Sequence, residues 1–282
     1  MGRSSCAVLT DPNFLDRGEQ VRLGFGLRST RRTDPALAIA DLPPLDLVVL
    51  SHLHDDHFDR VAGRELDQTL PNVTTGQAAW MLSRKGFAGA QGLQNWETST
   101  FSKGNSVLRV TSMPAKHAPK PLQFVLPPAM GSLLEFQDWS GRTSLRLYIS
   151  GDTLIHDDLK EISRRYPDTD LALLHLSGTR IFGVLLTMDA HQGVEALRLI
   201  GPSPAIPIHY ENYAVFKSPL RHFRVAVREA GLADRVTYLG RGESFHLVAR
   251  SAAPEPGDSV VPGADRLDGP PGRDQPSLDR FA

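Results

Sequence analysis

The segment VVLSHLHDDHFD, residues 48 to 59, places three imidazoles and three carboxylates directly after a run of aliphatic side chains. If the chain up to His52 is a strand, the alternation of side chains puts His52 and His54 on one side as the chain leaves the sheet. Asp56 and His57 then follow on a turn. Such groups repel protons and one another when packed together, and a divalent cation that binds them deprotonated relieves this repulsion. The segment therefore predicts a metal site at the end of a buried strand.

Three later apolar segments also deliver a metal-binding residue type near their ends. His117 follows SVLRVTSM (106–113), Asp152 directly follows SLRLYISG (144–151), and His209 lies in PAIPIHY (204–210). Each position alone is weak, because a lone histidine at a strand end is more often structural and Asp152 could form an Asx turn. Together with the first cluster they favour one site at the carboxyl ends of several strands, where open α/β sheets bind their ligands.

Strand-like and helix-like segments alternate along the chain, which predicts a layered α/β architecture. Glycine, proline and charged residues bound the helix-like segments, and the last of them opens with Ser218 as a predicted cap. We predict a long surface loop that could fold over the site at 114–141, because this segment is rich in proline. The expected strands lie within 45–51, 106–113, 144–151, 170–177, 204–210 and 235–240, and the expected helices within 156–167, 188–201 and 218–231.

The overall composition limits the partners and the compartment. The 282 residues carry a formal net charge of −1, so no global field would gather nucleic acid, and no basic cluster is evident. Cys6 is the single cysteine, which excludes an intrachain disulfide and favours a reducing compartment. No segment has the length of a membrane span or the pattern of a secretory signal, so we expect a soluble cytoplasmic protein. Residues 251–282 are rich in Pro, Gly and Asp and predict a disordered tail.

The HxHxDH pattern that begins at His52, followed by a histidine, an aspartate and a final histidine on later strands, resembles the metallo-β-lactamase-fold hydrolases. The segments LTDPNF, GDT, HLSGTR, TMDAHQG and IPIHYENY are similar to the branch that contains N-acyl-phosphatidylethanolamine phospholipase D and the ascorbate-phosphate lactonases. The resemblance covers about Thr10 to Arg250. It implies a hydrolase domain over residues 1–250, folded as an αββα sandwich. Because members usually have two or more strands before the LTDP segment, this sandwich is expected to be shortened at its N-terminal strands.

The resemblance also implies a binuclear metal centre. His52, His54 and His117 would hold one divalent ion, and Asp56, His57 and His209 the other, with Asp152 as the bridge. Asp56 and Asp152 are the predicted catalytic residues, because the two ions would share an activated water that attacks a carbonyl or phosphorus centre. Nitrogen and oxygen donors suit zinc first, with manganese or iron as alternatives. The expected substrate is a small-molecule or lipid-like phosphodiester, lactone or other ester, and the residues do not identify it further.

Several residues near these motifs have more than one interpretation. His175 could touch substrate or orient a ligand, or it could be a satisfied core histidine. Tyr210 could donate a hydrogen bond to a substrate oxygen, although ordinary packing is the favoured interpretation. Asp55 is expected to face outward and His191 to be an exposed helix residue. We expect His156, His222 and His246 to be surface or helix residues without partners.

Two other classes of function remain open at this level. A metal-dependent oxidoreductase is one alternative, since this scaffold can activate dioxygen when it holds iron. An inactive, truncated member is the other, and the short N-terminal part of the sequence motivates it.

Overall fold

The structure is a computed structural model and describes residues 6–23, 26–120 and 122–248. The predicted tail, residues 251–282, lies outside these described residues. The smaller of the two main sheets contains four parallel strands. Their order is β1 (Val8–Thr10), β4 (Leu47–Val49), β5 (Asn72–Thr75) and β6 (Ala90–Leu93), so β1 forms one edge of this sheet.

The larger sheet contains six strands and is mixed. Its order is β14 (Ala205–Ile208), β11 (Leu171–His175), β10 (Thr143–Ile149), β9 (Met130–Asp138), β8 (Ser106–Pro114) and β7 (Thr98–Lys103). The first three strands are mutually parallel, and the pairs from β10 to β7 are antiparallel. Because two antiparallel steps restore direction, β8 runs the same way as β10, and the ends of β8, β10, β11 and β14 meet at one edge of the sheet.

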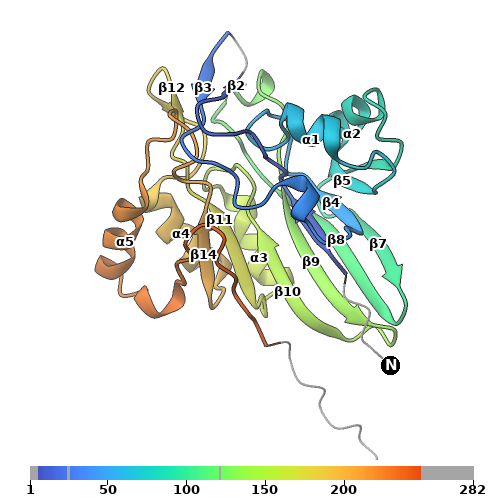
Figure 1. Cartoon of the computed structure of the whole chain (residues 1–282). Helices are drawn as coiled ribbons and strands as arrows, with labels where there is room; N and C mark the ends of the chain where they lie inside the picture. Colours follow the sequence, from blue (N-terminus) through green and yellow to red (C-terminus); the bar gives the residue numbers. More distant parts are fainter. Residues whose placement is uncertain (1–5, 24–25, 121, 249–282) are drawn as a thin grey trace, which may run out of the picture. The chain divides into compact units, whose positions relative to one another are not determined.

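Helices cover the outer faces of the two sheets (Figure 1). On the smaller sheet these are α1 (Arg60–Glu65) and α2 (Gly76–Ser83), and on the larger sheet α3 (Lys160–Arg165), α4 (Ala190–Ile200) and α5 (Leu220–Glu229). Two short hairpins complete the fold: β2 (Gln20–Arg22) with β3 (Arg28–Thr30), and β12 (Arg180–Ile181) with β13 (Val184–Leu185).

Three apolar layers follow from this arrangement. Leu47, Val49 and Val73 of the smaller sheet pack against Val110 and Leu134 of the larger sheet. The helices bury two further clusters on the outer faces, one around Phe58, Leu82 and Phe87 and the other around Tyr148, Leu174, Leu197 and Phe223. The described chain is therefore the predicted αββα sandwich.

Two predicted elements differ from the structure. Residues 130–138 form strand β9 instead of continuing a loop, so the loop spans only 115–129 apart from a short 3₁₀ turn at Leu122–Phe124. The prolines that predicted a loop end before this strand, and Gly131 permits close strand packing: a Cβ there would lie 3.1 Å from the carbonyl oxygens of Ile149 and Ser150.

The predicted strand at 235–240 is wrong, since only Val236 forms a bridge, to Ala205 of β14. The carbonyl of Ala205 accepts a hydrogen bond of 2.9 Å from the Thr237 N–H. Residues two apart in a strand direct their N–H groups to the same side, and the next residue on that side is Pro207, which has no N–H. The ladder therefore stops after one bridge.

The predicted Ser218 cap is also wrong for α5. The residue that precedes α5 is Pro219, and no side chain caps this helix. The Ser218 hydroxyl instead accepts a hydrogen bond of 2.9 Å from the Ala190 N–H, at the start of α4. Ser218 thus stabilises a neighbouring helix that is distant in sequence.

Candidate metal centre

The candidate ligands lie where the strands of both sheets end. His52 to His57 follow β4, His117 follows β8, Asp152 follows β10 and His209 follows β14. Two backbone distortions aim these residues. Gly151, with φ +57°, brings the chain so close to Met130 that a Cβ would lie 2.5 Å from its carbonyl oxygen. His209 itself has φ +54°, an uncommon conformation for a residue with a side chain.

His52, His54 and His117 form the first group, and their candidate ligand atoms lie within 4.8 Å of one another. Nε2 of His52 is 2.8 Å from Nδ1 of His54. The ring centroids of His52 and His117 are 4.8 Å apart. Three imidazoles thus face a common point.

Asp56, His57 and His209 form a second group of the same compactness. Nε2 of His209 lies 3.7 Å from Oδ2 of Asp56, and the ring centroids of His57 and His209 are 4.5 Å apart. The two predicted sets of three are therefore both brought together by the fold.

Asp152 lies between the two groups. Its Oδ2 is 3.5 Å from Nε2 of His57 and 3.9 Å from Nδ1 of His117, and its Oδ1 is 3.8 Å from Nε2 of His209. The Thr187 hydroxyl donates a hydrogen bond of 2.8 Å to Oδ2 and fixes the carboxylate. This is the position that a bridging carboxylate requires.

The donor set fits divalent cations because several of its buried polar atoms have no hydrogen-bond partner among the described residues. Buried side-chain atoms without a hydrogen-bond partner cost free energy and need an explanation, such as an ion. Five atoms of the two groups and of Asp152 are in this state: Oδ1 of Asp56, Nε2 of His57, Nδ1 of His117, Oδ1 of Asp152 and Nε2 of His209.

Burial keeps most of the imidazoles neutral. It lowers the pKa of His54 and of His117 to about 4, and it holds the pKa of His52 and His209 well below 6.5, with neighbouring histidines acting in the same direction. Neutral imidazoles offer the nitrogen lone pairs that a metal ion needs. The rings are therefore in the metal-binding form at neutral pH.

The carboxylates and His57 titrate as a coupled group. Burial opposes a charge on His57, but the carboxylates of Asp152, Asp11 and Asp56 outweigh it and raise the pKa of His57 well above 6.5. Burial also opposes the charge on Asp152, yet His57 and His209 hold the pKa of Asp152 well below 3.8. Burial raises the pKa of Asp56. The site thus gathers negative charge that a cation would neutralise.

Asp11 is a site residue that the sequence reading missed. It lies at the end of β1 with φ +42°, and its Oδ2 is 3.1 Å from Nδ1 of His57 and 3.2 Å from Nε2 of His175. Its Oδ1 accepts a hydrogen bond of 2.7 Å from the Ser51 N–H. The signal was available, because Asp11 follows the apolar residues of LTDPNF just as the other candidates follow their strands.

His175 and Tyr210 differ in how far they are buried. His175 is buried. Its Nε2 contacts Oδ2 of Asp11, and its Nδ1 lies 3.3 Å from the hydroxyl oxygen of Ser150. This favours the orienting interpretation over contact with substrate. Tyr210 is half-buried and lines a cavity beside His209.

The remaining histidines and Asp55 are mostly where the sequence placed them. Asp55 is not part of either group, and its Oδ2 accepts a hydrogen bond of 3.1 Å from the Arg22 N–H. His191, His222 and His246 are exposed. The prediction for His156 is wrong: its side chain is only 6% exposed, and its Nδ1 lies 3.3 Å from Oδ2 of Asp158 in the 3₁₀ turn that follows.

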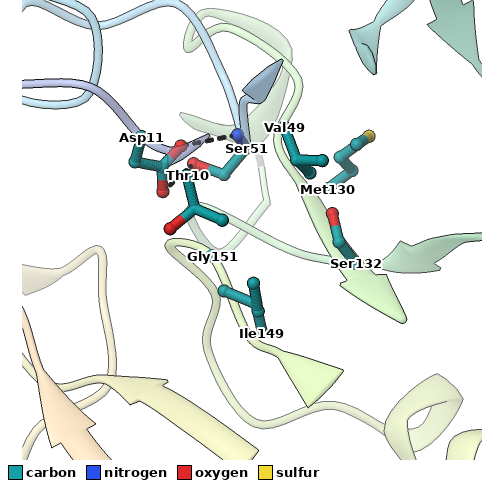
Figure 2. A pocket seen from close by; sticks show the side chains of 8 residues that line it. All are labelled: Thr10, Asp11, Val49, Ser51, Met130, Ser132, Ile149 and Gly151. Carbon is teal, nitrogen blue, oxygen red and sulfur yellow. Dashed lines mark hydrogen bonds between the residues drawn. The ribbon is translucent and has the colours of Figure 1, made fainter. Parts of the chain in front are cut away.

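Two cavities adjoin the site. The larger, of about 670 Å³, is lined by Asp11, His209 and Tyr210 together with apolar residues such as Leu9, Ile206 and Leu239. The smaller, of about 10 Å³, lies below Asp11 and Ser51, whose hydrogen bonds are drawn in Figure 2. The smaller cavity has room for at most about one water molecule, so only the larger can receive part of a substrate.

Comparison with known proteins agrees with this geometry. The family model described as a beta-lactamase superfamily domain matches residues 7–210. The chain belongs to this superfamily. A UPF0173 metal-dependent hydrolase of Methanosphaerula palustris is 30% identical over 207 residues, which cover 72% of this chain and 84% of that protein. This superfamily member therefore also belongs with the metal-dependent hydrolases.

Two further similarities concern the branch and the fold. N-acyl-phosphatidylethanolamine-hydrolyzing phospholipase D 1 of Caenorhabditis elegans is 28% identical over 224 residues, which cover 73% of this chain and 59% of that protein. The solved structure of a possible metal-dependent hydrolase from Veillonella parvula has a TM-score of 0.72 and 18% identity, with 88% of this chain and 95% of that one covered. The predicted branch and the metallo-β-lactamase fold of this superfamily member are thus confirmed.

Proposed function

We propose that the protein is a binuclear metal-dependent hydrolase that acts on a phosphodiester, a lactone or another ester. The observation that carries the proposal is the set of five buried, partnerless nitrogen and oxygen atoms that face one another across the two groups. Hydrogen bonds within the protein do not account for these atoms, and two cations would. The hydrolase class of the relatives supports the same conclusion.

In this proposal His52, His54 and His117 hold one ion, and Asp56, His57 and His209 hold the other. Asp152 would bridge them, because its carboxylate lies near His117 of the first group and near His57 and His209 of the second. All seven ligands offer nitrogen or oxygen, which suits zinc, with manganese or iron as the alternatives. We propose the cytoplasm as the compartment, since the chain has a single cysteine.

Bound divalent ions supply an activated water at neutral pH and charge that stabilises an oxyanion. The protein's own residues prepare this chemistry. Asp56 and Asp152 act as the catalytic carboxylates that position the attacking group, and Asp11 fixes the orientation of the His57 ring through Nδ1. Tyr210 would donate a hydrogen bond to a substrate oxygen, and the cavity that it lines would receive the apolar part of the substrate.

The two other functional classes are less well supported. The relatives named here are hydrolases, which does not favour the oxidoreductase alternative. An inactive member would not need all seven ligand positions, and the chain has six of them in two compact groups, with Asp152 between the groups.

Among the described residues, no helix is long and apolar enough to cross a membrane.

The test begins with metal quantification on the purified full-length chain. About two equivalents of a divalent ion per chain are expected, with zinc as the first choice. A panel of phosphodiesters, lactones and thioesters should then reveal hydrolysis that a chelator abolishes and that the same metal restores. A protein that binds two ions tightly but hydrolyses none of these, or that shows a redox signal from iron, would contradict the proposal.

A further inference from the structure

Two loop tips beside the candidate metal centre carry large, exposed apolar side chains. Phe182, at the turn between β12 and β13, is 94% exposed. Phe124 and Val125, in the loop at 115–129, are 76% and 58% exposed. Single exposed apolar residues are normal on soluble proteins, but here two of them are large aromatic side chains, each on a separate loop. We call Phe124, Val125 and Phe182 the apolar rim.

Both tips start from residues of the candidate site. The β12–β13 hairpin closes at Thr179 and Leu186, and the next residue, Thr187, donates to the Asp152 carboxylate. The loop at 115–129 contains His117 and ends at Met130, whose N–H donates to the Ser51 carbonyl. The apolar rim therefore belongs to the edge of the fold that holds the metal-binding residues.

A basic hairpin lies at the same end of the fold. Arg22 of β2 and Arg28 of β3 are paired across the β2–β3 hairpin, and both are exposed. Figure 1 shows this hairpin and β12 projecting in the same direction. The backbone N–H of Arg22 donates to Asp55, which directly precedes the candidate ligand Asp56.

The charges near the rim favour an anionic partner. Lys120 lies exposed in the same loop as Phe124. Two nearby acids have basic partners: Asp158 lies 3.2 Å from Lys116, and Asp189 lies 3.2 Å from Arg180. Asp55, which accepts the backbone N–H of Arg22, opposes part of the exposed positive charge, but Arg22, Arg28 and Lys120 together outnumber it.

We propose that the apolar rim and the basic hairpin dock on the surface of an anionic phospholipid bilayer. Separate tips can each enter a fluid headgroup layer, whereas a rigid protein partner would need one continuous apolar face. The arginines would contact the anionic headgroups while Phe182 and Phe124 reach the acyl boundary. Docking in this way would turn the candidate metal centre toward the lipid. The proposal concerns binding and does not depend on the proposed hydrolysis.

The experiment measures binding of the metal-loaded full chain to vesicles by sedimentation. The chain should bind vesicles of phosphatidylcholine mixed with phosphatidylserine better than vesicles of phosphatidylcholine alone. Phe124→Ser and Phe182→Ser should each weaken the partition about tenfold, because each removes a large apolar side chain from the lipid. Arg22→Gln and Arg28→Gln should each weaken it about fivefold, and only for the anionic vesicles.

Trp139→Ser is the matched control. Trp139 is 79% exposed, as prominent as the rim residues, but it lies in the turn between β9 and β10, at the opposite end of β10 from Asp152. Its substitution should leave vesicle binding unchanged. Circular dichroism and metal content are compared for every variant. A second measurement does not rely on weakened binding. In the Phe182→Trp variant of the otherwise natural chain, the fluorescence of the new tryptophan should be quenched by brominated lipid.

Three results would overturn the proposal. The first is no binding to anionic vesicles together with no quenching of the Phe182→Trp variant. The second is equal weakening by Trp139→Ser and by the rim substitutions. The third is a dimer in solution that the rim substitutions convert to monomer, because the rim would then be covered by a second copy of the chain.

Discussion

Asp152 has contacts that no other side chain in the candidate centre can replace. Its carboxylate faces His57, His117 and His209, and the Thr187 hydroxyl donates a hydrogen bond of 2.8 Å to it. Asp152→Ala should therefore lose one or both metal ions and nearly all hydrolysis. Metal content and turnover are measured on the same preparation.

Asp55→Ala is the control for this substitution. Asp55 lies in the same loop as Asp56 but contacts the Arg22 backbone and is not in either ligand group. The Asp55→Ala variant should keep both metal ions and most of the hydrolytic activity. Retention of both ions and full turnover by Asp152→Ala would refute the bridging assignment.

Asp11 is the second residue on which the site depends, although it is not a predicted ligand. It accepts from Ser51 and faces both His57 and His175, so it holds one imidazole in place and is itself held. Removing such an orienting carboxylate typically costs 10- to 100-fold in metal affinity or activity. Asp11→Asn should show a loss of about this size by metal titration and by kcat.

Asp46→Asn provides a comparison at a distant aspartate. Asp46 also accepts a backbone hydrogen bond, from Ala7, and it pairs with Lys103 near the start of β4. Its substitution should leave metal affinity unchanged. If Asp11→Asn bound metal and turned over like the natural chain, the orienting role would be excluded.

At the level of elements, helix α4 packs closely against the larger sheet and α5 because of Gly193. A Cβ at Gly193 would lie 2.8 Å from Cδ2 of Leu176 and 2.9 Å from Cε2 of Phe223. Alanine is normally about 1 kcal/mol better than glycine inside a helix. At Gly193 the steric overlap of the added Cβ should outweigh the higher helix propensity of alanine. Gly193→Ala should therefore lower the free energy of unfolding by about 1 to 3 kcal/mol, measured by urea denaturation.

Gly63 in α1 is a matched control for this prediction. A Cβ at Gly63 would find its nearest neighbour, Cε1 of Phe58, at 3.5 Å, which is an ordinary contact. Gly63→Ala should therefore be neutral or stabilising by up to about 1 kcal/mol. Stabilisation by both substitutions would show that α4 has room to move away from Leu176.

The elements that the sequence predicted correctly are those whose burial is continuous. Strand β4 is buried along its whole length, β8 and β10 are buried toward their carboxyl ends, and the period of α4 is clear between Asp189 and Gly201. The three errors described above share one cause, because contacts between segments remote in sequence outweighed a local signal. Residues 130–138 pair with β8 and β10, the segment at 235–240 meets Pro207 in β14, and Ser218 caps α4 instead of α5.

For the folded chain as a whole, the candidate centre makes stability depend on pH when no metal is bound. The pKa of His54 and His117 is about 4 in the folded state and near 6.5 in the unfolded state. Between these values the unfolded chain binds more protons, so the free energy of unfolding falls as the pH drops from about 6.5 to about 4. The loss should be on the order of 3 kcal/mol for each ring.

His57 acts in the opposite direction. Its pKa is raised well above 6.5, so its contribution is present below that value and is lost as the pH rises through its folded pKa. Urea denaturation in the presence of a chelator, from about pH 4 to above pH 6.5, measures both the acid limb, where stability falls with decreasing pH, and the alkaline limb, where it falls with increasing pH. The double variant His54→Gln with His117→Gln should flatten the acid limb, and an unchanged acid limb would show that these rings are not the cause.

The sequence alone determined the layered α/β class and the chemistry of the site. His52, His54, Asp56 and His57 are close in the chain, and His117, Asp152 and His209 each follow an apolar strand, so residue type and strand ends were sufficient to select them. Family membership agrees with that choice.

Only the tertiary structure decided how these residues meet. Whether β8 runs parallel to β10 depends on the intervening strand β9, which the sequence did not reveal. The place of Asp152 between the two groups, the link from Asp11 to His57 and His175, and the common end of the rim and the basic hairpin all depend on this pairing. Local patterns record what each segment prefers, whereas contacts between remote segments arise only when the sheets and helices pack together.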